Sequence, residues 1–367
     1  MFKRIYFFYL TYLTAMVYSQ TLMMLWFFQN GVSYTWMLFY FLAIYVPVLP
    51  LAFFFKGRKF KSRFSLWLGI VSSAGGVLIA NFITNQTYFI FLIAFVFALN
   101  TLFFWVIYSA MHFKYSHNEE HGFKSGAFFF LSPILSVFLA PLVGFIAEKL
   151  GYHFIFWSSM LFYLIPFSLV FYLPNFDFEF RAKAALFNTK HSLLVVFQGC
   201  IFMLTFYIIP IFTLFFISTP FKLGSFFGYL AVFAAFAALF NAKMSDKIKK
   251  RGHFFYIFTS LNALSFVPLV LSKSFLGWQI FSGLNNFTYG LANPFNLAMI
   301  LDHNEHDIVD TMLGRQIYSS LGAVFIIVFL LIAYCLTSSL QTALLWSALV
   351  PLSYPVVAYY QRLYLKK

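Results

Sequence analysis

Long apolar runs, each separated from the next by a few polar residues, recur along the whole chain. Each run holds about 20 residues, enough for a helix to cross a hydrocarbon core of about 30 Å. A helix also bonds its backbone polar groups within one segment, as lipid requires. The pattern predicts an all-α membrane protein with 12 transmembrane helices, over residues 5–28, 35–55, 64–83, 88–112, 126–147, 153–173, 192–217, 224–242, 254–272, 275–301, 313–337 and 340–361.

Composition agrees with a protein surrounded by lipid. Hydrophobic residues make up 62% of the 367 residues and charged residues only 9%, whereas an ordinary soluble domain has roughly 25% charged residues. The start of the chain, Met-Phe-Lys-Arg, is basic but lacks the short apolar region and cleavage site of a signal peptide, so we interpret it as an uncleaved first span. Cys200 and Cys335 fall inside predicted spans, where we expect them to serve packing.

The net charge of +14 raises the question of a nucleic-acid partner, and the positions of the basic residues answer it. With the N-terminus placed inside, 21 Lys and Arg fall on the cytoplasmic side and 3 on the other. Short cytoplasmic loops of membrane proteins hold such an excess, and anionic lipid head groups attract it. We therefore expect a multi-pass protein of the plasma (inner) membrane, with both termini cytoplasmic. Its partner would be the lipid bilayer, and we expect a monomer without nucleic acid or cofactor.

Two similar motifs expose an internal repeat. HNEEHG covers His117–Gly122 and HNEHDI covers His303–Ile308, and the Ala-Met pairs that precede them are 188 residues apart. Upstream of each motif stands a basic loop, at residues 56–63 and 243–253. Membrane transporters are often built from such repeats. We predict two six-helix pseudo-repeat bundles, residues 1–173 and 192–367, joined by a polar cytoplasmic linker over residues 174–191.

Both basic loops and span five carry family signatures. Residues 242–251, AKMSDKIKKR, fit the pattern G-x-L-a-D-r-x-G-r-k with both glycines replaced. The first loop keeps Gly57, Arg58 and Lys59 of this pattern but has no Asp. Residues 136–145, SVFLAPLVGF, look like g-x-x-x-G-P-x-x-G-G, which is commonest among exporters. Over essentially its whole length the chain resembles the major facilitator superfamily.

This resemblance implies a secondary transporter of a small organic solute, with efflux suggested by span five. The solute would bind between two bundles near the bilayer midplane and reach each side in turn as the bundles rock. The resemblance also implies that helices one, four, seven and ten line the cavity.

Polar stripes lie on those same helices, and a polar side chain in a span is costly unless it faces a cavity or a partner. The stripe of span four starts at Thr101 with spacings of four and three, which keep it on one face. The 188-residue offset maps it onto a second stripe in span ten. Alternatively, these groups bond between packed helices, at roughly 0.6 kcal/mol each. The substrate-cavity candidates are Tyr18, Gln20, Thr101, Trp105, Tyr108, Gln198, Asn285, Asn286, Tyr289, Asn293 and Asn296.

Acidic residues are absent from the middle of every predicted span, so no carboxylate lies at midplane to relay protons. This favours facilitated diffusion of a neutral substrate, or transport that is coupled to protons through His112 or Glu148. Arg315 begins span eleven. It could reach an anionic substrate, although a basic residue at a membrane end is more often an orientation or gate residue.

Charged loops on the cytoplasmic side predict a gate. We expect the acids near HNEHDI (Asp302, Glu305, Asp307, Asp310) to pair with the first basic loop (Arg58, Lys59, Lys61, Arg63), and Glu119 and Glu120 to pair with residues 247–251. Such pairs would hold the cytoplasmic side closed. The gate and signature candidates are Arg58, Lys59, Asp246, Lys250, Arg251, Asp307, Asp310 and Arg315.

HNEEHG also fits H-x-x-E-H, a pattern of some zinc proteases, with His117, Glu120 and His121 as the active residues. Gly122 follows at once and no acid occurs downstream before Glu148, so we expect neither an enzyme nor a metal site. A weak metal or pH site formed with the histidines of HNEHDI is a second alternative, against which stand ordinary solvated loop histidines. A non-transporting receptor or scaffold on the same fold is the third.

Overall fold

The computed structural model describes residues 2–82, 87–115, 121–189, 191–244, 251–302 and 307–364. Helices dominate these residues. The first part of the chain contains α1 (Phe2–Gln20), α2 (Met23–Gln29), α3 (Tyr34–Tyr45), α4 (Val48–Phe54), β1 (Lys59–Lys61), α5 (Ser62–Ala80), α6 (Thr87–Asn100), the π-helical η1 (Thr101–Trp105), α7 (Val106–Lys114), α8 (His121–Leu150), α9 (Tyr152–Leu169) and the short 3-10 helix η3 (Val170–Tyr172).

The second part begins with β2 (Asp177–Glu179) and α10 (Ala182–Asn188), which form the segment predicted as a linker. It continues with α11 (Ser192–Met203), the π-helical η4 (Leu204–Ile208), α12 (Ile209–Thr213), α13 (Pro220–Met244), α14 (Arg251–Leu271), α15 (Phe275–Asp302), α16 (Ile308–Thr337), α17 (Leu340–Ser347) and α18 (Leu349–Tyr364).

By length and composition, ten stretches of the described helices are long and apolar enough to cross a membrane. The first and tenth predicted spans are helical as well, as α1 with α2 and as α15, but they are not among the ten. A basic start at Lys3 and Arg4 makes α1 more polar, and four asparagines do the same for α15. The structure thus establishes an all-helical protein with ten such stretches, fewer than the twelve predicted.

Large apolar side chains on the outside of the molecule fit a lipid environment. Phe138, Leu161 and Leu336 are 74%, 67% and 77% exposed, and many other Phe and Leu side chains are exposed too. Apolar patches of this extent are rare on soluble monomers. Aromatic side chains also fill the interior, where Tyr12 and Tyr108 are fully buried.

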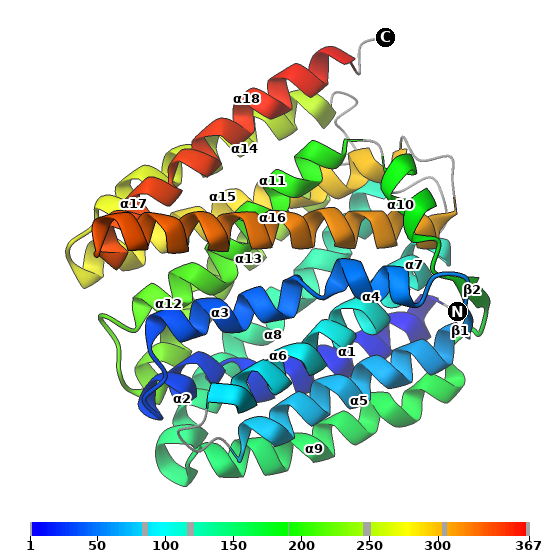
Figure 1. Cartoon of the computed structure of the whole chain (residues 1–367), viewed down its shortest axis with the longest axis horizontal. Coiled ribbons are helices and arrows are strands. Elements are labelled where there is room, and N and C mark those ends of the chain that lie inside the picture. Colours follow the sequence, from blue (N-terminus) through cyan, green and yellow to red (C-terminus); the bar gives the residue numbers. More distant parts are fainter. Residues whose placement is uncertain are drawn as a thin grey trace.

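The same helix pairings occur twice along the chain. In the first part, α1 packs on α8 and α9, α6 packs on α3 and α5, and α5 packs on α9. In the second part, α11 packs on α16 and α18, α15 packs on α13 and α14, and α14 packs on α18. Each pairing in one part has its counterpart six predicted spans later in the other. In Figure 1, α1, α5, α6 and α9 lie in the lower part of the view and α14, α16 and α18 in the upper part.

Contacts between these two groups run through a few helices. The long helix α8 packs on α13 and α15, and α16 packs on α3 and α7. Small residues allow the closest approach: a Cβ added at Gly224 of α13 would collide with the carbonyl oxygen of Ala140 in α8, and one at Gly228 would meet the ring of Pro141. Helices in membranes commonly use small residues in this way. The span-five signature therefore lies at the contact between α8 and α13.

The predicted linker is folded and touches both groups. Its strand β2 pairs antiparallel with β1 of the first basic loop, so that Lys59 lies opposite Glu179 and Lys61 lies opposite Asp177. Its helix α10 packs on α16, where a Cβ added at Gly314 would collide with α10. The hydroxyl of Tyr318 in α16 also donates to the carbonyl oxygen of Leu186, 2.9 Å away. Figure 1 shows β1, β2 and α10 at the end of the molecule where the N-terminus lies.

Candidate functional site

Three helices of the second part bring polar side chains together. On α15, Tyr289, Asn293 and Asn296 are all buried, and their spacing of four and three places them on one face. The amide nitrogen Nε2 of Gln198 in α11 donates to Oδ1 of Asn293, and Nδ2 of Asn296 donates to the hydroxyl of Tyr354 in α18, 2.8 Å away. The sequence prediction placed four of these five residues in one cavity; Tyr354 gave no signal because it is one of 23 tyrosines.

A small hollow adjoins this cluster. Gln198, Tyr289, Asn293 and Tyr354 line it, together with the apolar side chains of Ile201 and Ala292 and with Asn262. Two buried oxygens of the cluster, Oε1 of Gln198 and Oδ1 of Asn296, have no hydrogen-bond partner. Buried polar atoms are seldom left unpaired in folded proteins, because an unmade bond costs about 1–3 kcal/mol. The cluster therefore keeps capacity to bind a polar group.

Asn285 and Asn286, further along α15, belong to a different environment. Oδ1 of Asn285 accepts from Thr205 in η4 and its Nδ2 donates to Ser265 in α14, both at 3.0 Å. Asn286 donates to the carbonyl oxygen of Ser282 in its own helix. Asn285 thus matches the alternative in which polar groups bond packed helices to each other, whereas Asn286 bonds only within α15.

In the first part, the stripe of span four lies among aromatic rings. The ring of Tyr108 stacks on that of Tyr9, with centroids 4.2 Å apart, and Trp105 meets Tyr9 edge-on at 6.3 Å. Thr101 bonds to the carbonyl oxygen of Phe97 in its own helix. Thr101 and Trp105 bound the π-helical segment η1, and π-helical turns occur frequently at functional sites.

Asn100 is a polar residue that the stripe missed. Its Nδ2 donates to the hydroxyl of Tyr12 in α1 and to the carbonyl oxygen of Gly69 in α5, both at 2.8 Å. An asparagine inside an apolar run is itself a signal, because it is costly without partners. Asn100 therefore joins three helices of the first part.

Tyr18 and Gln20 point away from the span-four stripe. The hydroxyl of Tyr18 bonds to Ser158 of α9 at 2.8 Å. Gln20 donates to Ser73 of α5 at 3.0 Å and to Tyr163 of α9 at 3.3 Å. Both contacts join helices within the first part, so the structure does not bring these two candidates together with the polar cluster on α15.

Aromatic rings connect the two parts near the polar cluster. Phe41 of α3 packs on Tyr207 of η4 with centroids 4.6 Å apart, and the ring of Tyr45 meets Tyr207 edge-on at 6.4 Å. The neighbouring ring of Phe206 meets Tyr289 edge-on at 5.2 Å. A single sequence rich in Phe and Tyr gives no means of selecting Phe41 and Tyr45 from the other aromatics.

Arg315 lies in the second turn of α16, within electrostatic range of the Tyr289 hydroxyl. Its Nε atom is buried and donates to no group. In the described residues, Arg315 forms no hydrogen bond and no ion pair. The structure thus places this cation next to the polar cluster, apart from the loops that hold the other gate candidates.

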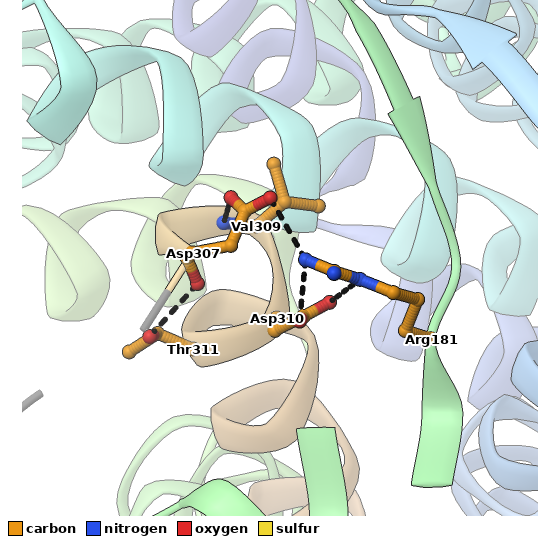
Figure 2. Close-up of polar contacts among 5 residues, drawn as sticks. All are labelled: Arg181, Asp307, Val309, Asp310 and Thr311. Atoms are coloured by element: carbon orange, nitrogen blue, oxygen red, sulfur yellow. Dashed lines mark hydrogen bonds and ion pairs between the residues drawn. The ribbon is translucent and has the colours of Figure 1, made fainter. Parts of the chain in front are cut away.

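Arg181 of the linker forms a charged contact with the start of α16, shown in Figure 2. Its guanidinium group lies 3.0 Å from Oδ2 of Asp307 and 2.8 Å from Oδ2 of Asp310. Asp307 also caps α16 by accepting from the backbone nitrogen of Val309, and its carbonyl oxygen accepts from the hydroxyl of Thr311. The Asp310 side chain is only 4% exposed, whereas those of Arg181 and Asp307 are about half exposed.

The predicted pairing of Asp307 and Asp310 with the first basic loop was wrong. Lys59 and Lys61 face the acids of β2, the guanidinium of Arg58 lies over the rings of Phe54 and Phe55, and Arg63 donates to the carbonyl oxygen of Leu173. The reason is that the linker folds back between the loop and α16 and supplies its own charges to both. Sequence reasoning noted Arg181 only as a polar linker residue.

Other predicted gate residues lie outside the described part of the chain: Asp246, Lys250, Glu119, Glu120 and Glu305, together with the side chains of Arg251 and Asp302. His117 and Glu120 of HNEEHG and the histidines of HNEHDI are outside it too, as is the side chain of His121. Within the described residues, no three His, Cys, Asp or Glu side chains gather in a way that could hold a metal ion.

Comparison with known proteins places the chain in a family. The model of the Major Facilitator Superfamily matches residues 5–325. Among solved structures, the crystal structure of the human organic anion transporter MFSD10 (TETRAN) superposes with a TM-score of 0.71 at 10% sequence identity, over 97% of this chain and 99% of that one. A search of curated protein sequences finds no match. The family match covers most of the chain, and the chain therefore belongs to the major facilitator superfamily of membrane transporters.

Proposed function

We propose that this protein moves a small organic solute across the membrane by alternating access between two six-helix bundles, residues 1–173 and 192–367. The recurrence of the same helix pairings in both parts supports this division. The contacts between the parts are also related by the repeat, since α8 on α13 corresponds to α16 on α3, and α8 on α15 to α16 on α7. Two similar bundles with matching contacts, related by an axis along the membrane normal, suit a rocking of one bundle against the other.

The substrate site of this proposal is the polar cluster of Gln198, Tyr289, Asn293, Asn296 and Tyr354. The observation that carries it is the pair of unpartnered oxygens on Gln198 and Asn296 beside a hollow. Those atoms are satisfied once a solute donates to them. Phe41 of the first bundle packs on Tyr207 of the second bundle near this cluster. Side chains of both bundles can therefore contact the solute.

The two ends of the molecule supply the gates. On the predicted cytoplasmic side, Arg181 bridges the linker to the start of α16. On the opposite side, the rings of Tyr34 and Phe215 stack with centroids 4.4 Å apart, and Gln29 donates to the carbonyl oxygen of Ser218. Alternating access requires these two sets of contacts to break in turn. Export is the direction we favour, because the span-five signature packs directly on α13 of the other bundle.

Transport is tested with purified protein in proteoliposomes. A panel of sugars, nucleosides, amino acids, organic anions and amphipathic cations is first screened for thermal stabilisation in detergent, and each stabilising solute is then offered in radioactive counterflow. We expect Asn293→Leu to remove both stabilisation and counterflow. Asn286→Leu is the matched control, since Asn286 is as buried but bonds only within its own helix. A solute that stabilises the protein yet shows no counterflow would assign a receptor role instead.

A further inference from the structure

Arg315 carries a charge that nothing in the described chain balances. It lies seven residues after the first residue of α16, about 10 Å along the helix axis at 1.5 Å per residue. A charged group inside a span pairs with another charge or faces a cavity. The five described carboxylates are engaged elsewhere: Asp307 and Asp310 with Arg181, Asp177 and Glu179 opposite lysines of β1, and Glu148 with the backbone nitrogen of Phe221.

The neighbours of Arg315 belong to the proposed substrate site. Four residues further along α16, the backbone of Ser319 is in close contact with Gly199 of α11, directly after Gln198 in the sequence. Residues four apart share a helix face, so Arg315 lies on the face of α16 that meets α11 beside Gln198. The hydroxyl of Tyr289, which lines the hollow, is close enough to interact electrostatically with the guanidinium group.

We propose that Arg315 binds the anionic group of the transported solute, so that the substrate is an organic anion whose apolar, aromatic-sized body also carries a hydrogen-bond donor for the oxygens of Gln198 and Asn296. This inference rests on the proposed transport function. The guanidinium group has a planar fork of donors that matches a carboxylate or sulfonate, and the ring of Tyr289, which packs edge-on against Phe206, offers an apolar surface on the same side of the cluster. The absence of carboxylates from the spans had favoured a neutral substrate; the unpaired arginine reverses that expectation.

The test uses purified full-length protein and a matched set of probes. Naphthalene, indole and biphenyl are each presented as the carboxylate, the primary amide and the aminomethyl cation, and binding is measured by thermal stabilisation. We expect at least one carboxylate to stabilise the protein more than its amide and amine. Arg315→Gln should weaken that carboxylate about tenfold to a hundredfold, as expected for loss of a charge-assisted bond, while Arg315→Lys should retain part of the affinity.

A readout without ligand separates this role from a structural one. Removing a partly buried charge that has no partner among the described residues relieves its desolvation cost, so Arg315→Gln should leave the melting temperature of the free protein unchanged or raise it. A clear fall in that temperature would assign Arg315 to a structural contact and overturn the inference. Equal binding of a carboxylate by wild type and Arg315→Gln, or no stabilisation by any carboxylate, would overturn it as well.

Counterflow in proteoliposomes distinguishes failure of the anion assignment from failure of the transport function. Transport of a neutral or cationic solute, with no competition from any carboxylate, would leave the transport function standing and remove the anion assignment. Binding of a carboxylate through Arg315 without counterflow would keep the anion site and remove the transport function. Counterflow of a carboxylate that is lost in Arg315→Gln supports both.

Discussion

Removing the Arg181 side chain should open the cytoplasmic end of the protein. Arg181 contacts Asp310 at 2.8 Å and Asp307 at 3.0 Å, and the Asp310 side chain is only 4% exposed. In Arg181→Gln the buried Asp310 carboxylate loses its contact with the guanidinium group, at a cost of about 1–3 kcal/mol. The half-exposed pair with Asp307 adds only about 0–1 kcal/mol, because solvent screens it. We expect the closed state to lose about 2 kcal/mol, or roughly a 30-fold change in the ratio of open to closed protein.

The assay measures alkylation of a cysteine behind this contact. Thr311 is 2% exposed and bonds to the backbone of Asp307, so Thr311→Cys reports whether the start of α16 is covered. The background carries Cys200→Ala and Cys335→Ser, which removes both native thiols. In inside-out vesicles, a membrane-impermeant maleimide should label Thr311→Cys about ten to thirty times faster when Arg181→Gln is added.

Two variants make this result specific. Lys183→Gln removes an exposed cation of the same linker and should leave the labelling rate unchanged. The double variant Arg181→Asp, Asp310→Arg swaps the two charges and so restores an ion pair. Its labelling rate should return toward that of the protein with Thr311→Cys alone. If Arg181→Gln labels no faster than Lys183→Gln, the contact does not hold the cytoplasmic end closed and the gate assignment fails.

Three further variants probe packing and the first bundle. Gly224→Val should lower the melting temperature in detergent by more than about 5 °C, because an added Cβ collides with the backbone of Ala140 and such overpacking costs about 1–3 kcal/mol. The control is Gly75→Ala, whose added Cβ meets only Val96 at 3.9 Å. It should change the melting temperature by less than about 2 °C. Asn100→Leu should destabilise the protein by about 1–3 kcal/mol, since it leaves Tyr12 and the Gly69 carbonyl without their partner; an unchanged midpoint of thermal unfolding would contradict this. Asn285→Leu should lower the melting temperature but keep ligand stabilisation, because its bonds join α14, α15 and η4; a specific loss of ligand response would return Asn285 to the binding site.

Much of the architecture could be predicted because a bilayer leaves few choices. Apolar runs of membrane length must be helical, and the 188-residue offset of the Ala-Met pairs aligned Thr101, Trp105 and Tyr108 with Tyr289, Asn293 and Asn296. Four of the eleven cavity candidates, Gln198, Tyr289, Asn293 and Asn296, lie in one buried cluster. Periodicity gives the face of a helix but not its rotation toward a neighbour, so it did not separate these residues from Tyr18 and Gln20, which bond to α5 and α9.

Charge pairing was the least predictable part of the site. The five basic residues of the first loop and the acids near the start of α16 carry opposite signs on one side of the membrane, and any of several pairings satisfies that pattern. The fold decides among them: β2 pairs with β1, which places Glu179 opposite Lys59 and Asp177 opposite Lys61 in the strand register. Arg181, two residues after Glu179, is then carried to the start of α16. The pairing followed from the fold of an eighteen-residue segment that composition described only as polar.

This arrangement gives the linker a part in the proposed rocking motion. One end of the segment is a strand hydrogen-bonded to the first bundle, and the other is a helix packed on α16 of the second. If the bundles rotate against each other, β1 and α16 separate or slide, and the segment cannot keep both contacts unchanged. Arg181 is its charged contact between the two anchored ends, and the exposed side of that contact is weak enough for solvent to replace. The strand pairing and the glycine-mediated contact at Gly314 are more extensive, so we expect the ion pairs to break first and the linker to stay attached at both ends through the cycle.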